Sequence, residues 1–232
     1  MVTGSTARTG QLLADDGPPA LLAAIRERRS ISKVGPERPP RELIEQVLEA
    51  ATWAPNHRLT EPWRFIVIAG EARHDLGRAM ARAHVAAMSG EVDDSAAEFA
   101  RLAAKPLRAP VIIAVGVEPA TGPKIIEAEE IAAGAAAVQN LLLAAHALGL
   151  GAMWRTGAAV DADEVKTLLG LSARAHLIGF VYLGYPVRAP PRRERTPAAM
   201  VTRWLGWEPD LEESEEFALR EVTSSEVFRV NL

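Results

Sequence analysis

Residues 125–148 read IIEAEEIAAGAAAVQNLLLAAHAL, and from Ile131 onward this stretch is apolar on nearly every side. Its length would allow a membrane span, but polar residues such as Gln139 and Asn140 interrupt the apolar surface. A helix that is apolar all round normally lies inside a protein. The small residues at 132–137 leave room for another backbone, as in a core or at a dimer interface. We therefore predict a helix that is buried on every side, either as the central helix of a core or at a dimer interface.

Three short apolar runs rich in β-branched residues have the composition of buried strands, and they are residues 65–69, 111–117 and 177–185. Helical patterns lie between and before these runs, over residues 18–28, 39–51, 71–88, 94–105, 125–148 and 161–170. A further short strand or turn is expected at residues 153–156. Helices and strands thus intermingle along the chain, which predicts a mixed α and β fold.

The composition limits the classes of function. The chain has 232 residues, a net charge of −4 and no cysteine. A net acidic chain argues against the broad basic surface that nucleic-acid binding needs, and a chain without cysteine has no disulfides and no thiolate metal ligands. The first ten residues, MVTGSTARTG, lack the apolar core of a signal peptide, so we expect a cytoplasmic protein.

Polarity divides the chain into three parts. Residues 1–17 are rich in Gly, Ser, Thr and Asp and are expected to form a flexible tail. Residues 18–207 contain the helical and strand patterns and are expected to form one domain. Residues 208–232 are acidic and then weakly amphipathic, which predicts a C-terminal extension that needs another surface for support.

A cluster of hydrogen-bond donors, RRSIS at residues 28–32, follows the first helical pattern. The planar guanidinium groups of Arg28 and Arg29 match two phosphate oxygens, and the Ser30 hydroxyl can bind the same anion. Cations at the end of a helix are also favoured by its dipole, without any ligand. The basic loop RAPPRRER at 188–195 has the same two interpretations, an anion contact or a solvated connection.

A polar loop rich in aromatic residues, TWAPNHRLTEPW at 52–63, joins the second helical pattern to the first strand. One interpretation is that Trp53 and His57 belong to the wall of a ligand site. The other is that Trp53 and Trp63 anchor the core and donate their indole N–H groups to carbonyls. The residue types alone leave both interpretations open.

Four segments in this order and spacing resemble the nitroreductase family of FMN-dependent oxidoreductases, and most closely its subgroup of small NAD(P)H nitroreductases. The segments are RRSIS, APNHRLTEPWRFIVI, EEIAAGAAAVQNLLLAAHALGLGAMWRTG and VYLGYP, and the resemblance covers roughly residues 20–205. It implies an α+β fold with a central, mainly antiparallel sheet flanked by helices. It also implies a homodimer that holds FMN in clefts at its interface, with the C-terminal segment extending over the partner.

The resemblance also implies roles for individual residues. Arg28, Arg29 and Ser30 match the family's N-terminal flavin-binding motif and would clamp the phosphate of FMN. Trp53 and His57 match positions that the subgroup contributes to the flavin site, from the other subunit.

A second group of matches lies after the long helix. Trp154, Arg155 and Thr156 match a stretch that lies along the flavin and its phosphate. Residues 144–149 match a stretch that the subgroup associates with the nicotinamide nucleotide.

This chain departs from the family pattern at several positions. Many members carry a cation two residues after the motif serine, where it stabilises the reduced flavin, and here that residue is Ser32. Asn and Gln commonly precede the Pro-Trp pair, whereas this chain has Leu59 and Glu61. Lys33 and Arg58 are the candidate substitutes for the missing cation.

The implied activity is ping-pong hydride transfer from NAD(P)H through FMN to a small-molecule acceptor, such as a nitroaromatic, a quinone or another flat molecule. The cofactor carries this chemistry, so neither a catalytic side chain nor a metal is expected. No nucleic-acid or membrane partner is expected. Two alternatives stay open, which are a flavin-binding sensor or scaffold without turnover, and a specialised family member that oxidises flavin or removes halogen.

Overall fold

The computed structural model describes residues 20–87, 96–157, 160, 162–189 and 194–207. Contacts divide the chain into two compact units, Met1–Pro190 and Pro191–Leu232. The expected tail at 1–17 and the expected extension at 208–232 lie outside the described residues. A single domain over 18–207 stays a prediction.

A four-stranded antiparallel sheet forms the centre of the first unit. Its strands are β1 (Trp63–Ala69), β2 (Val111–Val117), β3 (Gly151–Arg155) and β4 (His176–Gly184), in the order β1-β2-β4-β3. Strand β2 is buried along its whole length, because it lies between β1 and β4 and is covered on both faces. The α+β class with an antiparallel sheet is therefore confirmed.

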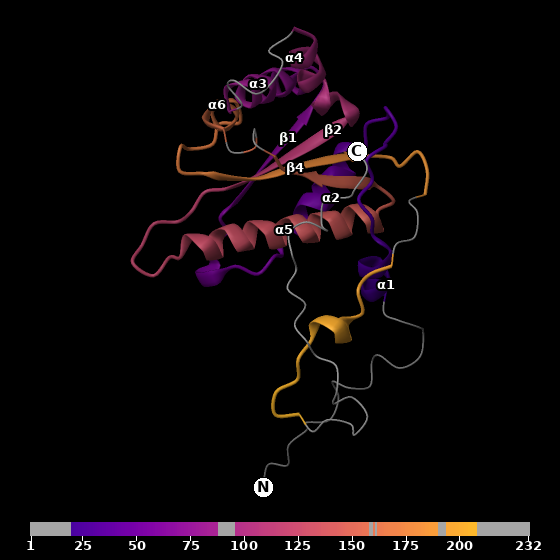
Figure 1. The fold of residues 1–232 in the computed structure, drawn as a ribbon, viewed down its shortest axis with the longest axis vertical. Helices are drawn as coiled ribbons and strands as arrows, with labels where there is room; N and C mark the ends of the chain where they lie inside the picture. Colours follow the sequence, from indigo (N-terminus) through magenta and orange to yellow (C-terminus); the bar gives the residue numbers. More distant parts are fainter. Residues whose placement is uncertain (1–19, 88–95, 158–159, 161, 190–193, 208–232) are drawn as a thin grey trace. The chain divides into compact units, whose positions relative to one another are not determined.

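Helices cover both faces of this sheet (Figure 1). One face carries α2 (Arg41–Thr52) and α5 (Glu127–Ala147), and the other carries α3 (Ala72–Ala87), α4 (Ala96–Ala103) and α6 (Asp163–Leu168). Helix α1 is Ala20–Glu27, and the described residues also form the short 3-10 helices η1 (His57–Leu59), η2 (Lys105–Arg108) and η3 (Ala198–Val201). No helix in the described part of the chain is both long and apolar enough to cross a membrane.

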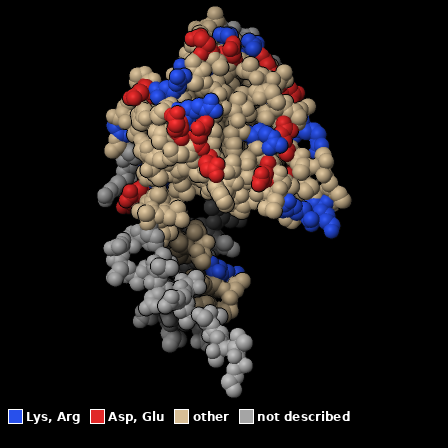
Figure 2. Space-filling view, turned by 180° about the vertical axis from the view of Figure 1, so that it is seen from behind, with Lys and Arg blue, Asp and Glu red and all other residues tan. Residues whose placement is uncertain are grey.

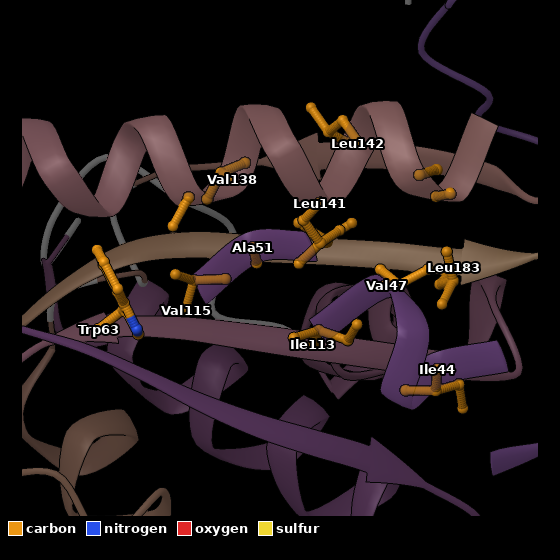
Figure 3. Packing of buried hydrophobic residues seen from close by; sticks show 14 of the residues in the cluster. Ile44, Val47, Ala51, Trp63, Ile113, Val115, Val138, Leu141, Leu142 and Leu183 are labelled. Atoms are coloured by element: carbon orange, nitrogen blue, oxygen red, sulfur yellow. The ribbon is translucent and has the colours of Figure 1, made fainter. Parts of the chain in front are cut away.

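The larger core lies between α2, α5 and the sheet. Val47 of α2 and Leu141 of α5 meet Ile113 of β2 there, and all three are fully buried (Figure 3). Trp63 belongs to the same cluster, which confirms it as a core anchor. Trp53 does not, because 78% of its surface is exposed.

Helix α5 buries only one of its faces within this chain. Ala133, Ala137, Leu141 and Ala145 form the buried stripe, whereas the opposite side, including Ala132, is exposed or half-buried. The expectation of a helix buried on every side is therefore met only in part by a single chain. The reason is that the sheet and α2 cover one side of α5.

The small residues of α5 allow a close approach to the sheet. A Cβ atom at Gly134 would lie 2.4 Å from Val117 Cγ2 of β2 and 3.0 Å from Ile178 Cγ1 of β4. Real side chains do not tolerate such distances. The glycine therefore sets how near the helix axis comes to the strands.

Charged side chains of both signs are scattered over one face of the molecule (Figure 2). On the face shown in Figure 2, acidic and basic side chains alternate over the described residues without forming a broad basic area.

Candidate functional site

The segment after α1 runs along the edge strand β3. The Ile31 N–H donates to the Ala152 carbonyl over 2.9 Å, and the Gly35 N–H donates to the Tyr185 carbonyl over 2.8 Å. A Cβ atom at Gly151 would lie 2.9 Å from Ile31 Cγ2, so glycine is needed for this close approach. These contacts hold the RRSIS cluster beside the C-terminal end of α5.

A cleft of about 420 Å³ opens at this point, which lies within the usual size range of small-molecule sites. Arg28, Arg29 and Arg188 contribute its positive charge, and its apolar lining includes Leu142 and Leu150. Three guanidinium groups over an apolar floor suit a ligand that joins an anionic group to an apolar body.

The Arg29 side chain in this cleft has both a paired and an unpaired hydrogen-bond donor among the described residues. Its Nη1 donates to the carbonyls of Arg26 and Arg28 over 2.6 and 2.9 Å. Its Nε is buried and has no hydrogen-bond partner among the described residues. Because buried N–H donors are normally paired, this atom indicates a place for an acceptor from a ligand.

Two further residues line the cleft, His146 and Arg188. His146 stands in the last turn of α5, and Arg188 belongs to the basic loop for which the sequence left two interpretations open. Only the fold brings them to Arg28, because the cleft joins segments far apart in the chain. The match of residues 144–149 to a nucleotide-associated stretch was the one signal for His146.

Trp53 and His57 lie away from this cleft within the chain. His57 pairs through Nδ1 with Glu129 in the first turn of α5, whereas His146 of the cleft is in the last turn of that helix. At a rise of 1.5 Å per residue, these positions are roughly 25 Å apart. One chain alone therefore does not bring His57 to Arg28.

Trp154 and Arg155 end β3 and make different side-chain contacts, and Thr156 follows the strand. The indole Nε1 of Trp154 donates to the Ile178 carbonyl over 3.1 Å, and Thr156 is exposed. The guanidinium carbon of Arg155 lies 5.3 Å from the centroid of the Tyr182 ring. Tyr182 packs in the core on the α3 side of the sheet, so the Arg155 side chain lies on the face opposite the cleft.

Arg155 belongs to a group of cations on that opposite face. Burial, followed by the charges of Arg101, Arg108 and Arg155, lowers the pKa of Lys105. Burial also raises the pKa of Tyr182, and the charges of Arg155 and Arg108 oppose that shift. Among the described residues, no carboxylate forms an ion pair with Arg155, whose buried Nε also lacks an acceptor.

The loop after Trp53 has an unusual backbone. Arg58, Leu59 and Glu61 have φ angles of 59°, 53° and 46°. Left-handed conformations of residues other than glycine cost on the order of 1–3 kcal/mol each and occur mainly where other contacts enforce them. The sequence contained no signal for this conformation, because none of the three residues is Gly or Asn.

A buried carboxylate supports this loop. Glu130 of α5 is 2% exposed and accepts hydrogen bonds from Thr60 Oγ1 over 2.7 Å and from the Ala120 N–H over 3.1 Å. Sequence reasoning missed Glu130, because acidic residues in a first helical turn are ordinary. In the described ranges, no group of His, Asp or Glu side chains could hold a metal ion.

Comparison with known proteins assigns the chain to a family. It matches the nitroreductase family model over residues 25–185. YdjA of Escherichia coli (strain K12), named as an NAD(P)H nitroreductase, is 34% identical over 165 residues, which cover 71% of this chain and 87% of YdjA. The crystal structure of a nitroreductase-like family protein from Bacillus cereus has a TM-score of 0.68 at 28% identity, covering 81% of this chain and 96% of that one. A nitroreductase from Desulfovibrio desulfuricans solved in complex with FMN has a TM-score of 0.59 at 32% identity, covering 82% and 96% of the two chains. By the family match and the 34% identity to YdjA, the chain belongs to the nitroreductase family.

Proposed function

We propose that this protein is an FMN-dependent NAD(P)H oxidoreductase and that the cleft beside α5 holds the phosphate end of FMN. The observation that carries the proposal is the buried Nε of Arg29, which has no partner in the described part of the chain and belongs to a cleft that Arg28 and Arg188 also line. Arg28, Arg29 and Arg188 would bind the phosphate oxygens, and the Ser30 hydroxyl would add a hydrogen bond. Family membership supports the same cofactor, since the relative from Desulfovibrio desulfuricans was solved with FMN.

The flavin ring would extend from this cleft along the end of β3. Trp154 and Thr156 would lie along it, and Arg155 would contribute its backbone, because its side chain is held on the other face of the sheet. Trp53 and His57 are too far from the cleft within one chain, so we propose that a second copy supplies them. The site is then complete only in a homodimer.

Bound FMN would supply hydride acceptance and donation, which no side chain of this protein can provide. The residues around the cleft bind and orient the ligands. The open site would admit NAD(P)H and then a flat acceptor such as a nitroaromatic or a quinone, in ping-pong order, and residues 144–149 at the end of α5 would contact the nicotinamide nucleotide. An apolar lining of this kind would accept acceptors of several shapes.

The test is the visible absorption spectrum of the purified protein, followed by anaerobic addition of NADH or NADPH. We expect a flavin band that bleaches on reduction and returns when a nitroaromatic or quinone is added. A band that persists with both nucleotides would indicate a flavin-binding sensor or scaffold instead. No band after incubation with FMN would overturn the proposal.

Substitutions of the arginines proposed to bind the phosphate distinguish a loss of FMN binding from a general loss of folding. Arg28→Ala and Arg188→Ala should each weaken FMN binding about 10- to 100-fold, since hydrogen bonds to charged groups contribute about 1.5–3 kcal/mol. Arg78→Ala is the matched control, because Arg78 pairs with Asp75 on the exposed surface of α3. Unchanged affinity in Arg28→Ala, measured by quenching of FMN fluorescence, would contradict the assignment of the clamp.

A further inference from the structure

The loop of residues 56–61 has a strained backbone and contacts a buried acid of α5, Glu130. The packing of the loop itself explains neither feature. Leu59 adopts a left-handed conformation although 82% of its surface is exposed, and Arg58 is exposed as well. The strained residues therefore bury little apolar surface that could stabilise their conformation. Strain of this kind marks functional segments that the surrounding structure holds in place.

Hydrogen bonds to α5 and to the end of β2 enforce the conformation. Glu130 connects the Thr60 hydroxyl to the Ala120 N–H, so one carboxylate joins the loop to the connection between β2 and α5. The Asn56 side chain accepts from the Glu61 N–H over 3.1 Å. These hydrogen bonds come from the loop itself and from the connection between β2 and α5.

The loop brings His57 to Glu129, the residue that precedes Glu130 in the first turn of α5. The neighbouring acid Glu129 binds the His57 ring, while Glu130 binds the backbone connection through Thr60. Two adjacent acids on the first turn of α5 thus control the side chain of His57 and the path of the chain that carries it. A loop can end without two separate acids that fix its histidine side chain and its backbone.

We propose that Glu130 is a positioning residue that holds residues 57–60 in the conformation in which His57 contacts the FMN bound mainly by a second copy of the chain. The inference rests on the proposed function. Glu130 does not touch the flavin and acts through Thr60. Without the carboxylate, the hydroxyl and the Ala120 N–H lose their shared acceptor, the loop relaxes from its left-handed conformation, and His57 moves away from the ring.

The test compares Glu130→Gln and Thr60→Val with the wild type in the full chain. The matched control is Glu127→Gln, because Glu127 also pairs with a histidine, His176, from the same helical turn. We expect at least a tenfold increase in the dissociation constant of FMN for Glu130→Gln, a smaller increase for Thr60→Val and none for Glu127→Gln. A shifted flavin absorption band should accompany the weaker binding, and the double variant should bind no more weakly than Glu130→Gln, because both changes break one linkage.

A purely structural role predicts a different outcome. In that case Glu130→Gln lowers the unfolding temperature while the folded protein keeps the wild-type FMN affinity and flavin spectrum, and this result would overturn the inference. Thr60→Val keeps the test decisive if Glu130→Gln does not fold, since it removes one hydroxyl and leaves the buried carboxylate in place. Failure of the wild type to bind FMN would overturn the proposed function, whereas unchanged binding in the variants alone would overturn only this inference.

Discussion

Gly134 shows how much a single missing Cβ atom contributes to this fold. Replacement by alanine improves the helix propensity of α5 by about 1 kcal/mol, but the new methyl group overlaps the Val117 side chain. Overpacking of a rigid core costs roughly 1–3 kcal/mol. We expect Gly134→Ala to lower the free energy of unfolding, measured by urea denaturation, by about 1 kcal/mol. Ala86→Ser at an exposed position of α3 should change it by less than about 0.5 kcal/mol, and equal effects would contradict this packing.

Lys105 shows how partial burial of a cation beside other cations lowers the stability of the folded protein. Burial and three arginines lower its pKa, so the unfolded chain binds more protons and stability rises with pH up to the unfolded value near 10.4. Lys105→Met should therefore raise the melting temperature at pH 7 by about 1–2 °C. The gain should disappear above about pH 10.4, and Lys124→Met, at an exposed position, should show none. A gain that persists at high pH would assign the effect to packing instead.

At the scale of elements, the carboxylate of Glu118, which follows β2, contacts the connection between α6 and β4. Glu118 accepts from the Ser172 N–H over 2.8 Å and from its hydroxyl over 2.6 Å. Burial opposes ionisation of Glu118, but these hydrogen bonds together with Arg64 and Arg174 hold its pKa below the usual value. The lowered pKa means that the contact stabilises the protein above the unfolded pKa of about 4.3 and loses this effect as the pH falls.

This linkage gives a pH-dependent prediction. Glu118→Gln should destabilise the protein by about 1 kcal/mol at pH 7, and the difference from the wild type should shrink as the pH falls from 5 towards 3. Thermal unfolding at several pH values measures it. A difference that is constant with pH would show that the charge of Glu118 is not involved.

At the scale of the whole molecule, one chain leaves apolar surface uncovered. Leu21, Leu22 and Ile25 of α1 are between 43% and 62% exposed, and the outer face of α5 carries several alanines and the half-buried Leu143 beside the exposed Gln139. Apolar faces of this kind mark contact with another chain. They agree with our proposal that a second copy completes the flavin site.

The dimer can be tested directly. Light scattering on the eluting protein should give twice the chain mass of 24.9 kDa. Leu143→Arg on the outer face of α5 should shift the mass towards one chain and release FMN, because a buried charge without a partner disfavours the interface. Leu168→Arg on α6 is the control, since Leu168 is exposed on the other face of the sheet. A dimer that survives Leu143→Arg would place the interface elsewhere.

The sequence alone determined the elements and their class, because hydrophobic periodicity and glycine and proline positions act locally. The run at 111–117 became β2 with the same bounds, and the run at 125–148 became α5. The RRSIS cluster was recognisable for the same reason, since its chemistry lies in consecutive residues.

Only the tertiary structure decided which distant groups meet. His146 and Arg188 lie with Arg28 in one cleft. The Arg155 side chain lies on the opposite face of the sheet, because residues along a strand alternate between the two faces. Glu130 became buried and the loop at 58–61 became strained through contacts between residues about 70 positions apart. Local sequence does not encode such contacts, whereas the packing of α5 against the sheet brings them about.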